Sequence, residues 1–388
     1  MINRGIATFG LDYGKCPPWL FERMVKLGRE MTEIIIEEYG PDEFIRRLSE
    51  PGWFQSLGTV LAFDWNASGL TTILTAALKE AVRGREAELG VFVCGGKGKT
   101  SLKTPDDIRK AGQILDFTPA EVEGLVYNSK MSAKVDSSLL QDGFQLYHHA
   151  FFLSRNGAWA VVQQGMNAEA QSARRYHWFS RDAGDLVVEP HSGISSKVLQ
   201  PTLDMTAKKS VPNQHLSTEM VQGNYKSLWK DIELLSKHSS NLSQSIRLRS
   251  GQQTISFLNL ESKEFHAHPA VKENFAESRY LKKIFERLCS DKPENYEKLV
   301  SMEGVGPKTI RALSLVSEVI YGAEPSYDDP ARYSFAHGGK DATPYPVDRP
   351  TYDSTIEFFQ NVINKMKVSK SEKHELSQKL PLPEKMGK

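Results

Sequence analysis

The segment 302–310, MEGVGPKTI, contains residue types that suit the binding of a phosphate group. Its two glycines allow positive φ angles and a close approach of the backbone to a ligand. Pro307 suits the first turn of a helix, where its missing N–H group is not needed. A turn of this kind before a helix presents backbone N–H groups to an anion, and a lysine adds a positive charge. We therefore predict a phosphate-binding hairpin whose contacts come from Gly304, Val305, Gly306, Lys308 and Thr309.

Apolar residues on both sides of this segment recur at helical spacing. Tyr296, Leu299 and Val300 precede it, and a longer apolar stripe begins at Ile310 and ends before Gly322. This periodicity predicts a helix on each side, joined by a tight turn. The two helices are the elements that position the hairpin.

The pattern over residues 296–322 resembles the helix-hairpin-helix motif of DNA-repair proteins, which holds the duplex backbone without reading sequence. More narrowly, GVGPKT resembles the hairpin of endonuclease-three-type glycosylases. The resemblance implies double-stranded DNA as the partner and Lys308 as a Schiff-base nucleophile. It also implies an aspartate after the second helix, for which Asp329 and Asp348 compete.

An abasic-site lyase needs a neutral amine and a base that removes the C2′ proton. A lysine has a pKa of about 10.4, so burial or a neighbouring cation must lower it before the amine becomes nucleophilic. Lys308 is the first candidate, with Lys340, Lys99 and Lys134 as alternatives. The base or orienting group is expected among Asp329, Asp341 and Asp348.

A second glycine-rich segment, GGKGKTS at 95–101, follows a short apolar run. A nucleotide-binding P-loop requires glycine five residues before Gly98, where this chain has Val93. The segment therefore favours a flexible basic loop over a nucleotide site. Its lysines, Lys97 and Lys99, are expected to add DNA-phosphate contacts.

Composition limits the classes of protein. The 388 residues allow two or three domains, and a net charge of +1 gives no general basic field, so DNA contacts must be local. The three cysteines are widely spaced, which argues against disulfides and a cysteine zinc site. No apolar run suggests a signal peptide or a membrane span, and we expect a cytoplasmic protein without a cofactor or metal.

The predicted fold class is α+β. We expect a mixed α/β domain with an antiparallel hairpin sheet at 1–190 and a linker or crossing loop at 191–214. A helical domain with the helix-hairpin-helix follows at 215–365, and a basic flexible tail at 366–388. Asn156-Gly157 predicts a two-residue hairpin turn that places Phe152 opposite Val161. In that strand His148 and His149 point to opposite faces and cannot easily serve one site.

Three segments resemble an uncharacterised archaeal domain-of-unknown-function family, number 763. They are residues 13–21 (YGKCPPWLF), 64–72 (DWNASGLTT) and 337–341 (HGGKD). The likeness extends over most of residues 1–365 and implies an archaeal origin but almost no mechanism. Members more often carry histidine where this chain has Asp12 and Asn66, which weakens any proposal that places chemistry there.

The favoured function is a DNA-repair protein that cleaves at abasic or damaged-base sites, as an AP lyase or a glycosylase/lyase. Three alternatives remain open. A metal-dependent nuclease would use Asp328, Asp329, Asp341 and Asp348 around magnesium. A non-catalytic DNA-binding module would use the hairpin alone, and a phosphate-dependent small-molecule enzyme would use the segment 95–100.

Overall fold

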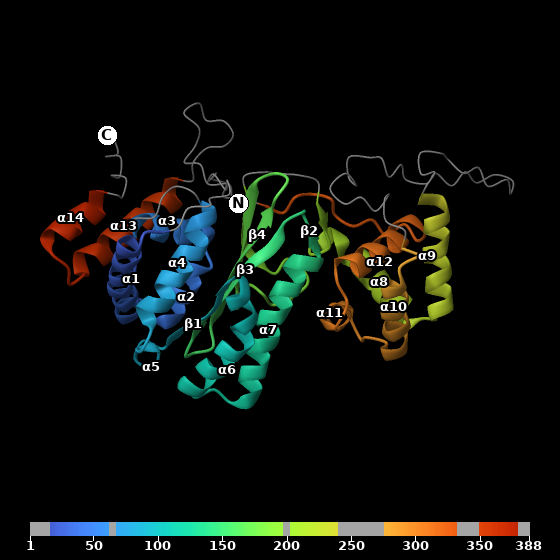
Figure 1. Ribbon diagram of the computed structural model, residues 1–388, viewed down its shortest axis with the longest axis horizontal. Coiled ribbons are helices and arrows are strands. Elements are labelled where there is room, and N and C mark those ends of the chain that lie inside the picture. Colours follow the sequence, from blue (N-terminus) through green and yellow to red (C-terminus); the bar gives the residue numbers. More distant parts are fainter. Residues whose placement is uncertain (1–15, 62–66, 197–201, 240–274, 332–348, 379–388) are drawn as a thin grey trace, which may run out of the picture.

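A computed structural model describes residues 16–61, 67–196, 202–239, 275–331 and 349–378 (Figure 1). In chain order the helices and strands are α1 (Pro18–Tyr39), α2 (Pro41–Leu48), α3 (Pro51–Val60), α4 (Ala67–Val82), α5 (Glu86–Leu89), β1 (Val91–Lys97), η1 (Gly98–Lys103), α6 (Thr104–Ile114), α7 (Pro119–Ser138), β2 (Leu140–Gln141), β3 (Gln145–Ser154), β4 (Trp159–Asn167), β5 (Ser172–Phe179), β6 (His191–Ser196), β7 (Leu203–Asp204), η2 (Lys208–Ser210), α8 (Val211–Gln222), α9 (Tyr225–Ser239), α10 (Arg279–Asp291), α11 (Tyr296–Ser301), α12 (Pro307–Val319), α13 (Arg349–Lys365) and α14 (Lys370–Gln378).

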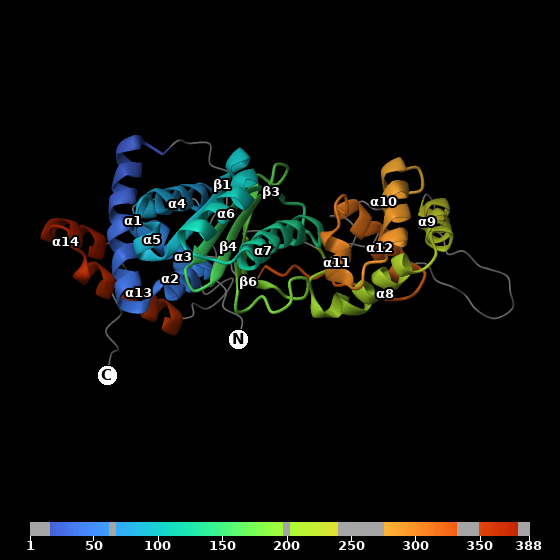
Figure 2. The same cartoon turned by 90° about the horizontal axis from the view of Figure 1, so that it is seen from below.

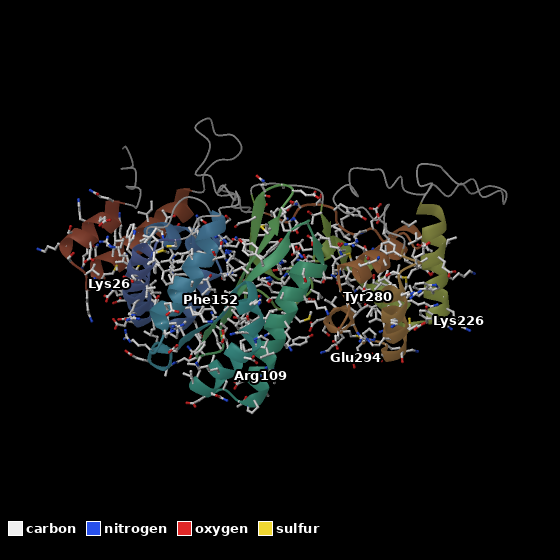
Figure 3. All side chains as sticks on the ribbon, in the orientation of Figure 1. Lys26, Arg109, Phe152, Lys226, Tyr280 and Glu294 are labelled. Atoms are coloured by element: carbon white, nitrogen blue, oxygen red, sulfur yellow. The ribbon has the colours of Figure 1, made fainter. Side chains whose placement is uncertain are left out.

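An antiparallel sheet of order β1-β3-β4-β5-β6 forms the centre of the molecule. Successive residues of a strand point to opposite faces, so each strand contributes to two cores. On β3, Phe151 packs with α6 and α7, whereas Phe152 packs with α1 to α4. Figure 2 shows α4 and α7 lying along the sheet, and Figure 3 shows Phe152 among the side chains between α4 and the strands.

The β3–β4 hairpin differs by one residue from the predicted register. Phe152 pairs with Ala160 instead of Val161. The turn contains three residues, because Ser154 N donates to Ala158 O and Gly157 N donates to Ser154 O. Gly157 has φ 83°, the left-handed geometry of three-residue hairpin loops. The Asn-Gly pair thus predicted the hairpin correctly, but the two-residue turn and its register were wrong.

The helices α8 to α12 form the C-terminal helical part, and the predicted α+β fold class is confirmed. Their apolar side chains join the core that α6 and α7 share with the sheet. In Figure 1 this part lies at the right of the sheet, beside α7. Leu281, Ile284, Phe285 and Leu288 supply the buried face of α10, and Tyr280 is 49% exposed (Figure 3).

The structure departs from two of the predicted segment boundaries. The expected linker 191–214 contains β6, which is an edge strand of the sheet, together with β7 and the start of α8. These strands are short and polar, which is why the sequence resembled a loop.

The expected basic tail begins with ordered structure. Met366 is buried, and α14 buries Leu376. The preceding helix, α13, was predicted to belong with the C-terminal helices, yet Phe359 stacks on Trp53 of α3 with ring centroids 5.5 Å apart. Figure 1 shows α13 and α14 beside α1, at the far end from α12.

Candidate nucleic-acid interface

The predicted hairpin lies between α11 and α12, and its conformation depends on Gly304. This residue has φ 80°, and a Cβ atom there would lie 2.6 Å from Ile284 Cδ1. Val305 follows with its side chain 3% exposed in the core, and its N–H group donates to Met302 O over 3.2 Å. The turn is therefore closed by one internal hydrogen bond and one buried apolar anchor.

Two backbone N–H groups at the start of α12 remain open. Gly306 is the N-cap residue, and no side chain caps the helix. Among the described residues, no acceptor takes the N–H groups of Gly306 and Lys308, and both residues are partly exposed. Unpaired N–H groups at a helix N-terminus carry partial positive charge and bind anions. The hairpin thus has the donor set that a backbone phosphate requires.

The predicted contact residues do not all contribute in the same way. Lys308 is partly exposed and can place its charge at the open N–H groups. Thr309 is fully buried and Val305 nearly so, which leaves their side chains unavailable to a ligand. Val305 cannot offer its N–H group either, because Met302 O accepts it.

Two cationic side chains from other elements lie against the hairpin. Lys134 on α7 donates from Nζ to Met302 O over 2.6 Å. Burial lowers the pKa of Lys134, and the charge of Arg287 lowers it further, against the opposite effect of Glu303. Arg287, on α10, has Nη2 3.6 Å from the position of a Cβ on Gly304. Its Nε and Nη2 are buried and have no hydrogen-bond partner within the described part of the chain.

The remaining contacts hold the hairpin to the α/β half. Gln141 of β2 donates to Pro307 O over 3.0 Å and accepts from Arg311 Nη1 over 2.8 Å. Tyr127 of α7 donates to Glu297 of α11 over 2.6 Å. No local sequence pattern indicates the role of Arg287, because its place beside Gly304 depends on how α10 packs.

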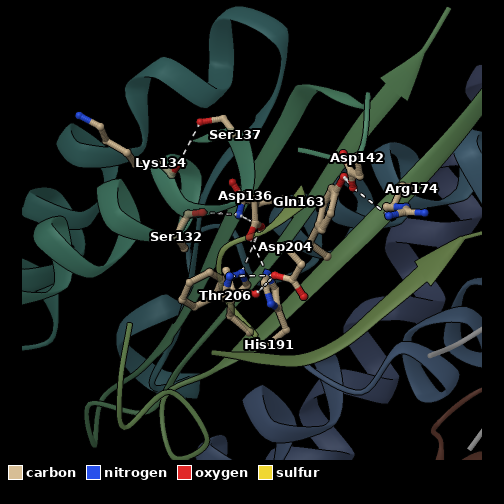
Figure 4. A network of polar contacts seen from close by, with 12 residues as sticks. Ser132, Lys134, Asp136, Ser137, Asp142, Gln163, Arg174, His191, Asp204 and Thr206 are labelled. Carbon is tan, nitrogen blue, oxygen red and sulfur yellow. Dashed lines mark hydrogen bonds and ion pairs between the residues drawn. The ribbon is translucent and has the colours of Figure 1, made fainter. Parts of the chain in front are cut away.

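A buried network fixes α7, and with it Lys134 (Figure 4). Asp136 accepts from Gln163 Nε2 over 2.5 Å and from Trp178 Nε1 over 3.1 Å. Its other oxygen lies 2.6 Å from His191 Nε2. These bonds connect α7 to β4, β5 and β6, and Figure 4 shows Lys134 pointing away from them. The network does not touch the hairpin, but it fixes α7 and so the position from which Lys134 contacts Met302 O.

Asp329, a candidate catalytic residue, is held by Arg174 of β5. The Asp329 Oδ2 to Arg174 Nη2 distance is 2.6 Å, and Arg174 Nη1 lies 3.0 Å from Asp142 Oδ2. Burial works against the charge of Arg174, but the two carboxylates raise its pKa overall. Asp329 thus takes part in a buried ion-pair cluster, and its carboxylate faces Arg174 of the sheet.

The other predicted site residues do not join the hairpin. Lys97 ends β1, an edge strand, and Lys99 lies in η1. The segment predicted as a flexible loop is instead a strand end followed by a 3-10 helix. Lys340, Asp341 and Asp348, together with Asp12 and Asn66, lie outside the described residues.

Neither a metal centre nor a membrane span is found in the described ranges. No group of three or more histidine, cysteine, aspartate or glutamate side chains there could hold a metal ion. No helix among them is both long and apolar enough to cross a bilayer.

The fold and the hairpin define a two-part α+β protein with a candidate phosphate-binding turn. The chain matches the model of the family described as "Protein of unknown function (DUF763)" over residues 5–347 and belongs to that family. Neither the curated proteins nor the solved structures contain a match to it.

Proposed function

We propose that this protein binds duplex DNA through the hairpin 302–309 and cleaves at abasic or damaged-base sites through a lysine Schiff base. The observation that carries the proposal is the pair of open N–H groups at Gly306 and Lys308, with the Lys134 amine beside the same turn. Contacts of backbone N–H groups with phosphates position a protein on DNA without reading sequence.

The reaction needs one amine and one base. The amine attacks the C1′ aldehyde of the ring-opened abasic sugar and loses water, which forms the Schiff base. A base then removes the C2′ proton, and the electron pair expels the 3′ phosphate. An abasic site is accessible at low cost, because no base has to be unstacked.

Two lysines at the hairpin are candidates for the amine. Lys308 is the nucleophile by resemblance to the glycosylases. Lys134 is the second candidate, because burial and the charge of Arg287 lower its pKa, which favours a neutral amine. For the base, Asp341 and Asp348 remain candidates by sequence, whereas the pairing of Asp329 with Arg174 favours a structural role for Asp329.

The test is borohydride trapping on a duplex with a single abasic site, with and without EDTA. Wild type, Lys308→Ala and Lys134→Arg would be compared, because arginine keeps the charge beside Met302 O but supplies no nucleophilic amine. A covalent adduct that survives EDTA is expected, and its loss in one variant identifies the amine. Absence of both adduct and strand cleavage in the wild type would refute the lyase mechanism.

The same experiment separates the alternative functions. Cleavage that EDTA abolishes and that leaves no adduct would indicate a metal-dependent nuclease. Duplex binding without cleavage under any condition would indicate a non-catalytic module. In both cases the hairpin remains the proposed contact with the DNA backbone.

A further inference from the structure

One face of α10 lies along the hairpin. Its residues Tyr280, Ile284 and Arg287 follow the i, i+4, i+7 spacing that places side chains on the same side of a helix. The Tyr280 hydroxyl donates to Gly304 O. Ile284 Cδ1 and Arg287 Nη2 lie 2.6 Å and 3.6 Å from the position of a Cβ on Gly304. All three side chains therefore meet the turn at the same glycine.

These side chains differ in how far solvent reaches them. Ile284 is 8% exposed, whereas Tyr280 is 49% exposed (Figure 3). An exposed apolar side chain is common by itself. The Tyr280 ring, however, is fixed at the turn, because its hydroxyl is bonded to Gly304 O and a tyrosine has only two χ angles. The ring is therefore an exposed flat surface that is held in place beside the hairpin.

The surroundings of Tyr280 suit a polyanion. Lys283, one turn further along the same face of α10, is exposed. The turn itself carries one carboxylate, Glu303, and one lysine, Lys308. The open N–H group of Gly306 is two residues beyond the Tyr280 contact, so the two backbones lie within about 7 Å. That is about two nucleotides of a DNA strand, so a strand bound at the hairpin passes the ring.

Tyr321 offers a comparison within the same chain. It is 51% exposed, and its hydroxyl donates to Asp231 Oδ2 over 2.9 Å. It follows the C-terminal end of α12, whose 13 residues span about 20 Å from the hairpin. Its partner is a carboxylate, which repels phosphate. The two tyrosines thus have equal exposure, but only Tyr280 lies at the candidate DNA contact.

We propose that the Tyr280 ring stacks in the gap that a missing base leaves in a duplex held by the hairpin. A nucleotide occupies about 3.4 Å of the duplex axis, and a flat ring is thin enough to fill that space. In an intact duplex the ring has no such gap, because its insertion would first have to unstack a base step. The missing base is therefore the feature that Tyr280 recognises. This inference rests on the proposed function, because it takes duplex DNA as the partner of the hairpin.

The test compares the binding of two labelled duplexes by fluorescence anisotropy, one intact and one with a single tetrahydrofuran residue. The tetrahydrofuran sugar has no aldehyde and forms no Schiff base, so the comparison does not depend on the lysine chemistry. The wild type should bind the tetrahydrofuran duplex about tenfold more tightly, through the stacking of one ring. Tyr280→Ala should bind both duplexes equally, with unaltered affinity for the intact one. Tyr280→Phe keeps the ring and should retain most of the preference.

Two variants serve as controls. Tyr321→Ala removes a ring of the same exposure and should keep the tenfold preference. Lys308→Ala removes a phosphate contact and should weaken both duplexes by the same factor. A second readout uses the wild type alone, with 2-aminopurine next to the tetrahydrofuran residue. Its fluorescence should fall on binding, because the Tyr280 ring stacks on it.

Equal binding of the two duplexes by the wild type would overturn the inference and leave the hairpin as a duplex contact. The inference is also overturned by a preference that persists in folded Tyr280→Ala. If that variant fails to fold, 2-aminopurine fluorescence that does not fall in the wild type overturns it. Binding of neither duplex would refute the proposed function and the inference together. A preference without a borohydride adduct would refute the lyase mechanism alone.

Discussion

Lys134 Nζ lies 2.6 Å from Met302 O, so a helix of the α/β half holds the turn that begins the C-terminal hairpin. The contact joins residues 168 positions apart in the chain. Because the Asp136 network fixes α7, the position of the hairpin depends on the sheet as well as on its own two helices. Binding at the hairpin and the stability of the α/β half are therefore linked.

Replacing Lys134 by methionine should lower the free energy of unfolding by about 1 kcal/mol, because Met302 O loses its hydrogen-bond donor in a half-buried site. Lys134→Arg keeps a hydrogen-bond donor beside Met302 O, so its free energy of unfolding should fall by less than that of the methionine variant. Urea unfolding curves of the two variants and the wild type measure the difference. Equal stability of all three would show that the contact contributes nothing in solution.

The two hairpin glycines should respond differently to alanine. Gly304→Ala forces a side chain at φ 80° against Ile284 and should destabilise the protein by roughly 1–3 kcal/mol. Gly306 has an ordinary φ of −144° and open space around it, so Gly306→Ala should leave the melting temperature unchanged. Its added methyl group sits beside the open N–H groups and should weaken duplex binding. Unaltered duplex affinity of Gly306→Ala would argue against phosphate contact there.

Removing Asp329 should cost stability more than catalysis. Asp329→Ala removes one of the two carboxylates that pair with buried Arg174. It should lower the free energy of unfolding by about 3 kcal/mol. Thermal unfolding measures this change. The variant should still form the borohydride adduct and cleave the strand at temperatures where it is folded. A fully stable variant that forms the adduct but does not cleave the strand would restore Asp329 as the catalytic base.

Acid should destabilise the protein through its buried histidines. Burial lowers the folded-state pKa of His148, His149 and His177 below their unfolded value. The unfolded chain therefore binds more protons below pH about 6.5, and stability falls as pH drops from there toward 3. Each such histidine contributes up to about 1.4 kcal/mol per pH unit. In urea unfolding between pH 7 and 5, His148→Asn should show a shallower loss than the wild type; an identical slope would mean that His148 is not buried neutral.

Duplex binding should be independent of sequence and sensitive to salt. The logarithm of the association constant should fall linearly with the logarithm of salt concentration, with a slope of about −0.9 per phosphate contacted. In Lys308→Ala this slope should be less negative by about one, because one phosphate contact is lost. Titrations of two unrelated duplexes at several salt concentrations measure both properties. A strong preference between the duplexes would contradict backbone binding.

Local signals in the sequence determined the elements. Pro17 and Gly40 are the N-cap and C-cap residues of α1, and Pro51 is the first residue of α3. Helical periodicity predicted α11 and α12 with the turn between them. These features depend on residues close together in the chain, where backbone sterics and apolar spacing act directly.

Only the tertiary structure decided which elements meet. It placed Lys134 and Arg287 at the hairpin, paired Asp329 with Arg174, and packed α13 against α3 instead of the C-terminal helices. It also set the register of β3 against β4, because a shift of one residue in their turn changes every pair between these two strands. Such contacts join positions far apart in sequence, and their energies come from burial and charge pairing that no local pattern records.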